Sequence, residues 1–344
     1  MKKKDSPPPS VAIAHYVPHA EQSQGGYYAP MLQGPATNTL AHTSARKDAF
    51  IMDAITKVGT LESGELKLFI DGFEGSLRIS ARKLLDALAI ELTKQTDYRG
   101  SFLPPVHVAL SLEQYMELCG QDISKKVRVD EARKRVKEDM NILFRASFEW
   151  KGEGRDKGDF LKSRICTDIA FKKGTIQFAF SPKMAAYLQQ AYLMQYNMNL
   201  FKIDGLNPHT WLIARKLNEH HSMDSNKAAG TANTLSVASL LKAAPDIPSF
   251  EEVAKTDRHF TKRIITPLET SLDQLVAADF LSEWTYWNAR NTPLTDEQLA
   301  ALDHNTFIKL YVHFEFAHTP PDQTPRLEAK KARPVRKKPT KARA

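Results

Sequence analysis

Two stretches of this chain place a basic amphipathic helix directly before an aromatic segment with the alternation of a strand. The first runs from Lys125 to Trp150 and the second from Asp257 to Trp287. In each, apolar residues recur at the spacing of one helix face, and aromatic and β-branched residues follow. A helix that leads into a strand hairpin is the order of a winged helix. The repetition predicts two such modules in tandem.

A helix-turn-helix pattern precedes the first basic helix. Ser80 is expected to cap a leucine-rich helix, and 106–110 to form a strand. Ser111 then caps a helix that ends at Gly120. The basic helix follows at 129–145, with its charged residues on the face opposite the apolar ones.

The strands of the first wing are expected after that helix. They are placed at 146–151 and 160–171, joined by the charged glycine-rich loop GEGRDKG as the wing tip. A turn at 172–174 then leads into one more strand, TIQFAFS. This order completes the first module.

The second half of the chain follows the same plan. Besides the basic helix, it is expected to contain helices at 181–196, 207–221 and 235–243. A loop is expected at 222–234. Wing strands are expected at 280–287 and 306–316, around an insertion.

Pro267 interrupts the second basic helix. Proline in a helix interior costs about 3 kcal/mol or more unless the helix breaks or kinks there. Either Thr266 caps a new helix in a capping box with Glu269, or one helix continues through a kink. Both alternatives leave Arg258 and Lys262 at the exposed front of the helix.

The formal net charge of +8 comes from the end of the chain. Residues 326–344 hold nine of the 48 Lys and Arg residues and one of the 40 acidic residues, which leaves 39 of each sign in residues 1–325. A neutral body attracts a polyanion only where positive charge is segregated, as in 125–137 with seven basic residues. The tail alone predicts attraction to phosphates without sequence preference.

These patterns predict an α+β fold with two tandem winged-helix domains. The expected divisions are a disordered arm at 1–45, winged-helix domains at 46–180 and 181–318, and a basic disordered tail at 319–344.

A helix fits the major groove of DNA, where Arg and Lys donate hydrogen bonds to guanine. One basic helix alone is more often a solvated surface, but two in matching contexts favour a DNA-binding protein. The predicted DNA-binding residues are Lys125, Lys126, Arg133, Lys134, Lys137, Asn141, Arg155, Lys157, Arg258, His259, Thr261, Lys262, Arg263 and Thr266.

No pattern of a catalytic or metal site stands out. The loop GEGRDKG lacks the spacing of a Walker phosphate loop. There is no His-Glu-x-x-His, and two cysteines cannot build a zinc site alone. A rolling-circle nickase needs a His-hydrophobe-His pair, and none of the eleven histidines has that arrangement. We therefore expect no enzymatic activity, no cofactor and no metal.

The two cysteines, Cys119 and Cys166, lie in apolar-patterned segments. This placement is typical of buried free thiols in a reducing compartment. The chain has no run of about 18 apolar residues and its N-terminal segment does not read as a signal peptide. We expect a cytoplasmic protein without membrane contact.

The second half resembles the plasmid replication initiators of the iteron-binding, tandem winged-helix type. The resemblance rests on IQFAFSPKMAAYLQQ, then FKIDGLNPHTWLIARKLNEHH, then HFTKRIITPLETSLDQL before an aromatic strand. Two features depart from the family pattern. Asn207, Pro208 and His209 stand where a Ser-Lys-Tyr-like step is common, and residues 288–305 lengthen the second wing.

The resemblance implies a protein that binds double-stranded DNA at the direct repeats of a plasmid origin and starts theta-type replication. It further implies a homodimer formed through the first domain, repression of the protein's own promoter, and contacts with a host initiator and replicative helicase. The alternatives are a winged-helix transcriptional repressor without initiator activity and a rolling-circle nicking enzyme.

Overall fold

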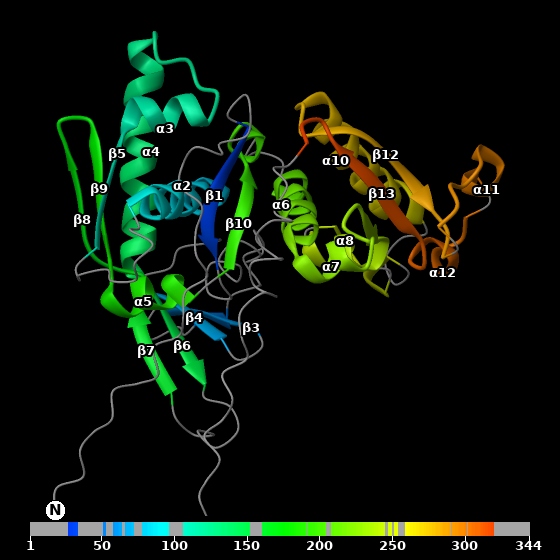
Figure 1. The fold of residues 1–344 in the computed structure, drawn as a ribbon, viewed down its shortest axis with the longest axis horizontal. Helices are drawn as coiled ribbons and strands as arrows, with labels where there is room; N and C mark the ends of the chain where they lie inside the picture. The colour runs from blue at the N-terminus through cyan, green and yellow to red at the C-terminus, as the bar shows by residue number, and fades with distance from the viewer. Residues whose placement is uncertain are drawn as a thin grey trace, which may run out of the picture.

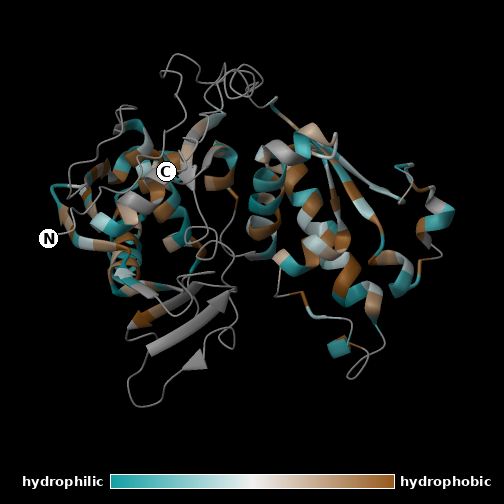
Figure 2. Cartoon of the chain, turned by 60° about the horizontal axis from the view of Figure 1, so that its bottom comes forward, coloured by the Kyte–Doolittle hydropathy of each residue, from teal (hydrophilic) through white to brown (hydrophobic). Residues whose placement is uncertain are grey.

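The computed structural model contains two lobes that share one connected cluster of buried side chains. Figure 2 shows that the helices carry both hydrophilic and hydrophobic positions, as expected for helices that pack on one face. The structure describes residues 27–33, 51–52, 58–63, 66–71, 78–95, 106–151, 160–190, 192–203, 208–244, 247–249, 251–253, 259–289, 291–300 and 302–319.

The first lobe contains a winged helix (Figure 1). Its elements are α2 (Ile79–Gln95), β5 (Val106–Ser111), α3 (Leu112–Leu118), α4 (Lys126–Arg145), β8 (Cys166–Lys172) and β9 (Thr175–Phe180). The three strands form an antiparallel sheet in the order β5-β9-β8. As predicted, Ser111 caps α3, and Gly120 ends the helix region with a φ of 65°. The structure adds that Gln114 completes a capping box with Ser111.

The second lobe repeats this topology. Its elements are α6 (Pro208–Ser222), β11 (Thr234–Ser236), α8 (Val237–Ala243), a π-turn η5 (Thr261–Ile265), α10 (Thr266–Ala277), β12 (Leu281–Trp287) and β13 (Tyr311–Phe316). The sheet order is β11-β13-β12, so the last strand lies in the middle as it does in the first module. The predicted α+β fold with tandem winged helices is confirmed.

The predicted first wing is wrong. β6 (Ala146–Lys151) and β7 (Phe160–Arg164) pair with each other in a separate five-stranded sheet, of order β2-β3-β4-β6-β7. The chain changes sheets at the buried Ile165, whose backbone N–H donates to Ala146 O. A period of two residues marks a strand but not its partner, so 160–171 read as one strand. The wing is the β8-β9 hairpin with its turn at Lys173 and Gly174.

The other strands of that sheet are β2 (Ile51–Met52), β3 (Val58–Ser63) and β4 (Leu66–Asp71). β4 pairs with β6 on one side and with β3 on the other, and all pairs are antiparallel. The strand predicted around residues 65–73 therefore exists. It serves this second sheet rather than the winged helix.

Part of the predicted disordered arm is a strand. β1 (Tyr28–Gln33) pairs with β10 (Tyr192–Asn197), and Met31 lies opposite Met194 with both side chains buried. Composition does not reveal a strand whose partner lies some 160 residues away in sequence. The rest of the arm apart from Tyr27, and the predicted tail beyond residue 319, lie outside the described residues.

The helix predicted at 181–196 is also divided. α5 (Pro182–Gln190) ends before β10, in which Met194 and Tyr196 are buried. α5 contacts β1 and β7, and β10 pairs with β1 and also contacts α6 of the second module. The limits of the two predicted winged-helix domains stay a prediction.

Smaller corrections concern helix and strand ends. Ser80 lies inside α2, where its hydroxyl donates to Asp139, and does not cap the helix. The predicted loop at 222–234 contains the short helix α7 (Asp224–Ala228). The strand β11 precedes α8 and is too short to show a period. The insertion holds α11 (Asp296–Ala300) and α12 (His304–Phe307), so the last strand starts at Tyr311.

Candidate nucleic-acid interface

The helix α4 presents one apolar and one polar face. Val136, Met140 and Leu143 are buried against the first lobe, in which α4 contacts α2 and β8. The opposite face is exposed. Of the predicted residues, Lys125, Lys126, Lys134, Lys137 and Asn141 are exposed there, and Arg133 is half-buried.

Ion pairs occupy part of the positive charge on α4. Arg133 Nη1 lies 2.5 Å from Asp130 Oδ1, and Lys125 Nζ lies 3.5 Å from Asp122 Oδ2. Lys126 and Lys134 form no ion pair within the described part of the chain. Because exposed ion pairs are worth only about 0–1 kcal/mol, the paired cations remain available to a phosphate.

A buried contact fixes α4 on α2. Asp139 faces inward, and its Oδ1 accepts a hydrogen bond of 3.1 Å from the Ser80 hydroxyl. Burial raises the pKa of Asp139 to about 7, although Ser80 acts in the opposite direction. At the surface, Arg78 Nη1 donates to Glu138 Oε2 over 2.6 Å. α4 is therefore held on the first lobe by a buried and a surface contact, both with residues at the start of α2.

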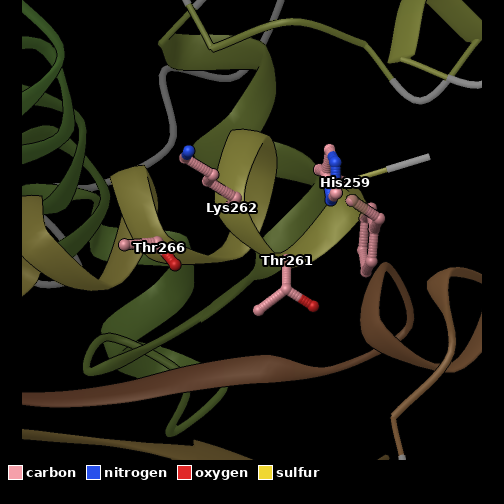
Figure 3. Close-up of a pocket in the computed structure, with 5 residues that line it drawn as sticks. His259, Thr261, Lys262 and Thr266 are labelled. Atoms are coloured by element: carbon pink, nitrogen blue, oxygen red, sulfur yellow. The ribbon is translucent and has the colours of Figure 1, made fainter. Parts of the chain in front are cut away.

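The second candidate surface lies at the start of the η5–α10 helix. Predicted residues His259, Thr261, Lys262, Arg263 and Thr266 are all exposed. An open pocket of about 310 Å³ is lined by His259, Phe260, Thr261, Lys262 and Thr266. In Figure 3, Lys262 and Thr266 lie toward one side of the view and His259 toward the other, with Thr261 between them.

One continuous helix with a π-turn resolves the two alternatives at Pro267. The Thr266 N–H donates to Thr261 O, five residues back, and Ile265 and Thr266 have helical backbone angles. No side chain caps α10, so the new-helix alternative is wrong. The wider turn accommodates the proline without ending the helix, and such turns are frequent at functional sites.

Aromatic contacts anchor the start of this helix. The Phe260 ring lies 5.7 Å from that of Phe307 and 5.3 Å from that of His304, both on α12. Behind it, Ile264, Leu268 and Leu272 are buried. The polar residues of the first turn are thus presented by an apolar platform that the insertion in the second wing helps to build.

Three predicted contact residues, Arg155, Lys157 and Arg258, lie outside the described residues. The wing formed by β8 and β9 carries Lys172 and Lys173 at its turn. Both are exposed, and neither was predicted to contact DNA. The run Lys-Lys-Gly between two strand patterns was the available signal, because a charged turn after a recognition helix is a wing tip. The second wing carries Asp296, Glu297 and Asp303 in its insertion and is not basic.

The described residues contain no group of three or more His, Cys, Asp or Glu side chains placed to hold a metal ion. Cys119 and Cys166 are both free, and burial raises the pKa of each thiol. In the part of the chain that the structure describes, no helix has the length and apolar character needed to cross a membrane.

A comparison with protein families matches residues 70–207 to the initiator replication protein WH1 domain. The matched segment contains the whole first winged helix, from α2 to β9, together with α5 and β10. A comparison with curated proteins finds no match.

The solved structures to which this chain is similar include the Pi initiator protein in complex with iteron DNA. That chain is 12% identical, with a TM-score of 0.45 over 69% of this chain and 90% of the other. Domains 2 and 3 of RctB are 9% identical in one structure, with a TM-score of 0.41 and coverage of 82% and 99%. A second RctB structure is 10% identical, with a TM-score of 0.43 and coverage of 80% and 96%.

Proposed function

We propose that this chain, whose residues 70–207 match the WH1 domain of initiator replication proteins, is a plasmid replication initiator that binds repeated double-stranded DNA sites at its origin. The observation that carries the proposal is the match of the WH1 model to the first winged helix. A second winged helix with the same strand order follows in the same chain and supports it.

In the proposed complex, α4 and the η5–α10 helix each enter a major groove. Phosphate contacts position such a protein, and contacts with base edges specify the sequence. Lys126, Lys134 and Lys137 on α4 and Thr261, Lys262 and Thr266 on the second helix are the proposed contacts. Two modules joined in one chain act at a high effective concentration, so their specificities multiply.

The remaining parts of the proposal concern partners and activity. We infer that the protein forms a homodimer through its first domain, contacts a host initiator and replicative helicase, and represses its own promoter. It acts in the cytoplasm through binding and not through nucleotide hydrolysis or strand cleavage. A repressor without initiator activity and a nicking enzyme are the alternatives that the experiments below separate.

The binding proposal is tested with Lys262→Ala on the DNA that flanks the gene. Loss of a base contact lowers affinity for the repeat by about 1–3 kcal/mol and leaves non-specific affinity nearly unchanged. Lys183→Ala, at an exposed lysine on α5, is the matched control and should bind normally. An equal loss on all DNA would mean that Lys262 contacts phosphate only.

The initiator proposal needs a test of replication. A plasmid that carries only this gene and its flanking repeats should be maintained, and the Lys262→Ala version should be lost. Specific binding without plasmid maintenance would favour the repressor. Nicks or a covalent protein adduct on supercoiled repeat DNA with Mg²⁺ would favour the nicking enzyme.

A further inference from the structure

An apolar side chain stands among the charges of the first recognition helix. Val127, in the first turn of α4, is 70% exposed. The large hydrophobic side chains exposed among the described residues are Ile123 at 40%, Val127 at 70%, Met223 at 46% and Val276 at 37%. Val127 is the most exposed of these, and the solvated face of its own helix gives it nothing to pack against.

The helix period aligns Val127 with the polar stripe. Seven residues make nearly two turns, so Val127, Lys134 and Asn141 follow one another along one line of α4. The rise per residue places Val127 and Lys134 roughly 10 Å apart along the axis. A molecule that contacts Lys134 and Asn141 along this face therefore also meets Val127.

Positive charge surrounds this valine in sequence. Lys125, Lys126 and Arg128 are its neighbours, and all three are exposed. The nearby acids are engaged, since Asp130 pairs with Arg133 over 2.5 Å and Glu131 with Arg128 over 3.8 Å. This combination of cations around one apolar group fits a polyanion that also offers an apolar group.

We propose that Val127 contacts the C5 methyl group of a thymine in the major groove and so makes the first module selective for that base. The inference rests on the proposed function. Thymine alone among the four bases presents a methyl group there, and the first residues of a recognition helix are the ones that reach base edges. A β-branched side chain is stiff in a helix, so its methyl groups hold one position with little entropy to lose.

Uracil substitution isolates the methyl group, because uracil differs from thymine only in lacking it. Each thymine of the bound repeat is replaced in turn, and the affinity of the full chain is measured. One position should weaken binding about three- to fivefold, as expected for one buried methyl group. Val127→Ala should weaken binding to the thymine-containing repeat by a similar factor. On the repeat with uracil at that position, the variant should bind as tightly as the wild-type protein does.

The matched control is Val276→Ala, the same change at an exposed valine on α10. It should keep the full sensitivity to uracil. Alanine at an exposed helix position favours the helix, so neither variant is expected to unfold, and thermal melting verifies this.

Two results overturn the inference. Wild-type protein that binds its repeat specifically but tolerates uracil at every position has no methyl contact. A Val127→Ala variant that stays sensitive to uracil makes that contact through another residue. Both results leave the proposed function standing, whereas wild-type protein with no preference for any repeat sequence would overturn the proposed function and this inference together.

Discussion

Asp139 couples the packing of the helix α4 to the pH of the solution. Its side chain is buried on α4, its Oδ1 accepts from Ser80, and its Oδ2 has no hydrogen-bond partner among the described residues. Burial therefore disfavours the charged form and raises its pKa to about 7. The folded protein holds this proton more tightly than the unfolded chain, so the contribution of Asp139 is most favourable at low pH and is lost as pH rises through 7.

Asp139→Asn keeps an acceptor for Ser80 and removes the ionisation. The variant should be more stable than the wild type at pH 8. The fall in unfolding free energy from pH 6 to pH 8 should be smaller in the variant than in the wild type by about 1 kcal/mol. Urea unfolding at both pH values measures this. Glu138→Gln is the control, since Glu138 is its half-buried neighbour at the helix surface and has a lowered pKa caused first by Arg78. An unchanged pH dependence in Asp139→Asn would show that Asp139 ionises normally.

Helix periodicity predicted which face of α4 several single residues occupy. It placed Val136, Met140 and Leu143 inward and Lys134 and Asn141 outward, as the structure has them. It did not predict the burial of Asp139, because a carboxyl group is buried only where a partner such as Ser80 comes from another helix. Partners distant in sequence are not encoded in a local period.

Among the elements, the η5–α10 helix carries a structural cost at the end that we propose contacts DNA. Pro267 cannot donate a backbone hydrogen bond, and the π-turn from Thr261 to Ile265 accommodates it. The turn also sets the directions of Thr261, Lys262 and Thr266, which line the pocket in Figure 3. The π-turn therefore lowers the stability of the helix while it orients the three side chains proposed to contact DNA.

Pro267→Ala tests this opposition. Alanine restores the donor and favours a regular helix, so the melting temperature should rise, while the affinity for the repeat should fall several-fold as the contact residues rotate. Pro208→Ala at the first position of α6 is the control, because proline is well tolerated there and both quantities should change little. A higher melting temperature with unchanged affinity would separate the π-turn from DNA binding.

Element identity was more predictable from the sequence than element pairing. The helix cap at Ser111 and the charged helix α4 were predicted because their signals are local. The wing was placed on β6 and β7 because both hairpins show the same alternation, and only the pairing of β9 with β5 and β8 distinguishes them. The same limitation hid β1, whose partner β10 lies in another part of the chain.

At the scale of the whole molecule, a buried ionic cluster joins the two modules. Arg215 on α6 donates to Asp86 on α2, and its Nε lies 3.2 Å from Glu219 Oε1. The Tyr196 hydroxyl on β10 donates to Asp86 over 3.0 Å. All four side chains are buried. Because Arg215 bridges elements of both modules, its contacts help to set how α4 and the η5–α10 helix lie relative to each other.

Arg215→Met should therefore be costly in a pH-dependent way. Removing one partner of a buried ion pair typically costs about 3–5 kcal/mol, because the carboxylates remain without a counter-charge. Burial already raises the pKa of Asp86 to about 6 against the attraction of Arg215, and loss of the arginine raises it further. The raised pKa makes ionised Asp86 unfavourable, so the deficit should be larger at pH 8 than at pH 5.5, where the carboxyl group is protonated.

Urea unfolding of Arg215→Met at the two pH values measures this deficit, and Lys216→Met on the same helix, at a half-buried lysine, is the control. The control should lose little stability at either pH. The cluster is expected to hold the two modules in their arrangement. At pH 5.5, Arg215→Met should then bind DNA with the part of the repeat contacted by one module as well as the control does. It should bind the whole repeat more weakly than the control does. A deficit that is equal at both pH values would mean that Asp86 does not respond to the loss of Arg215.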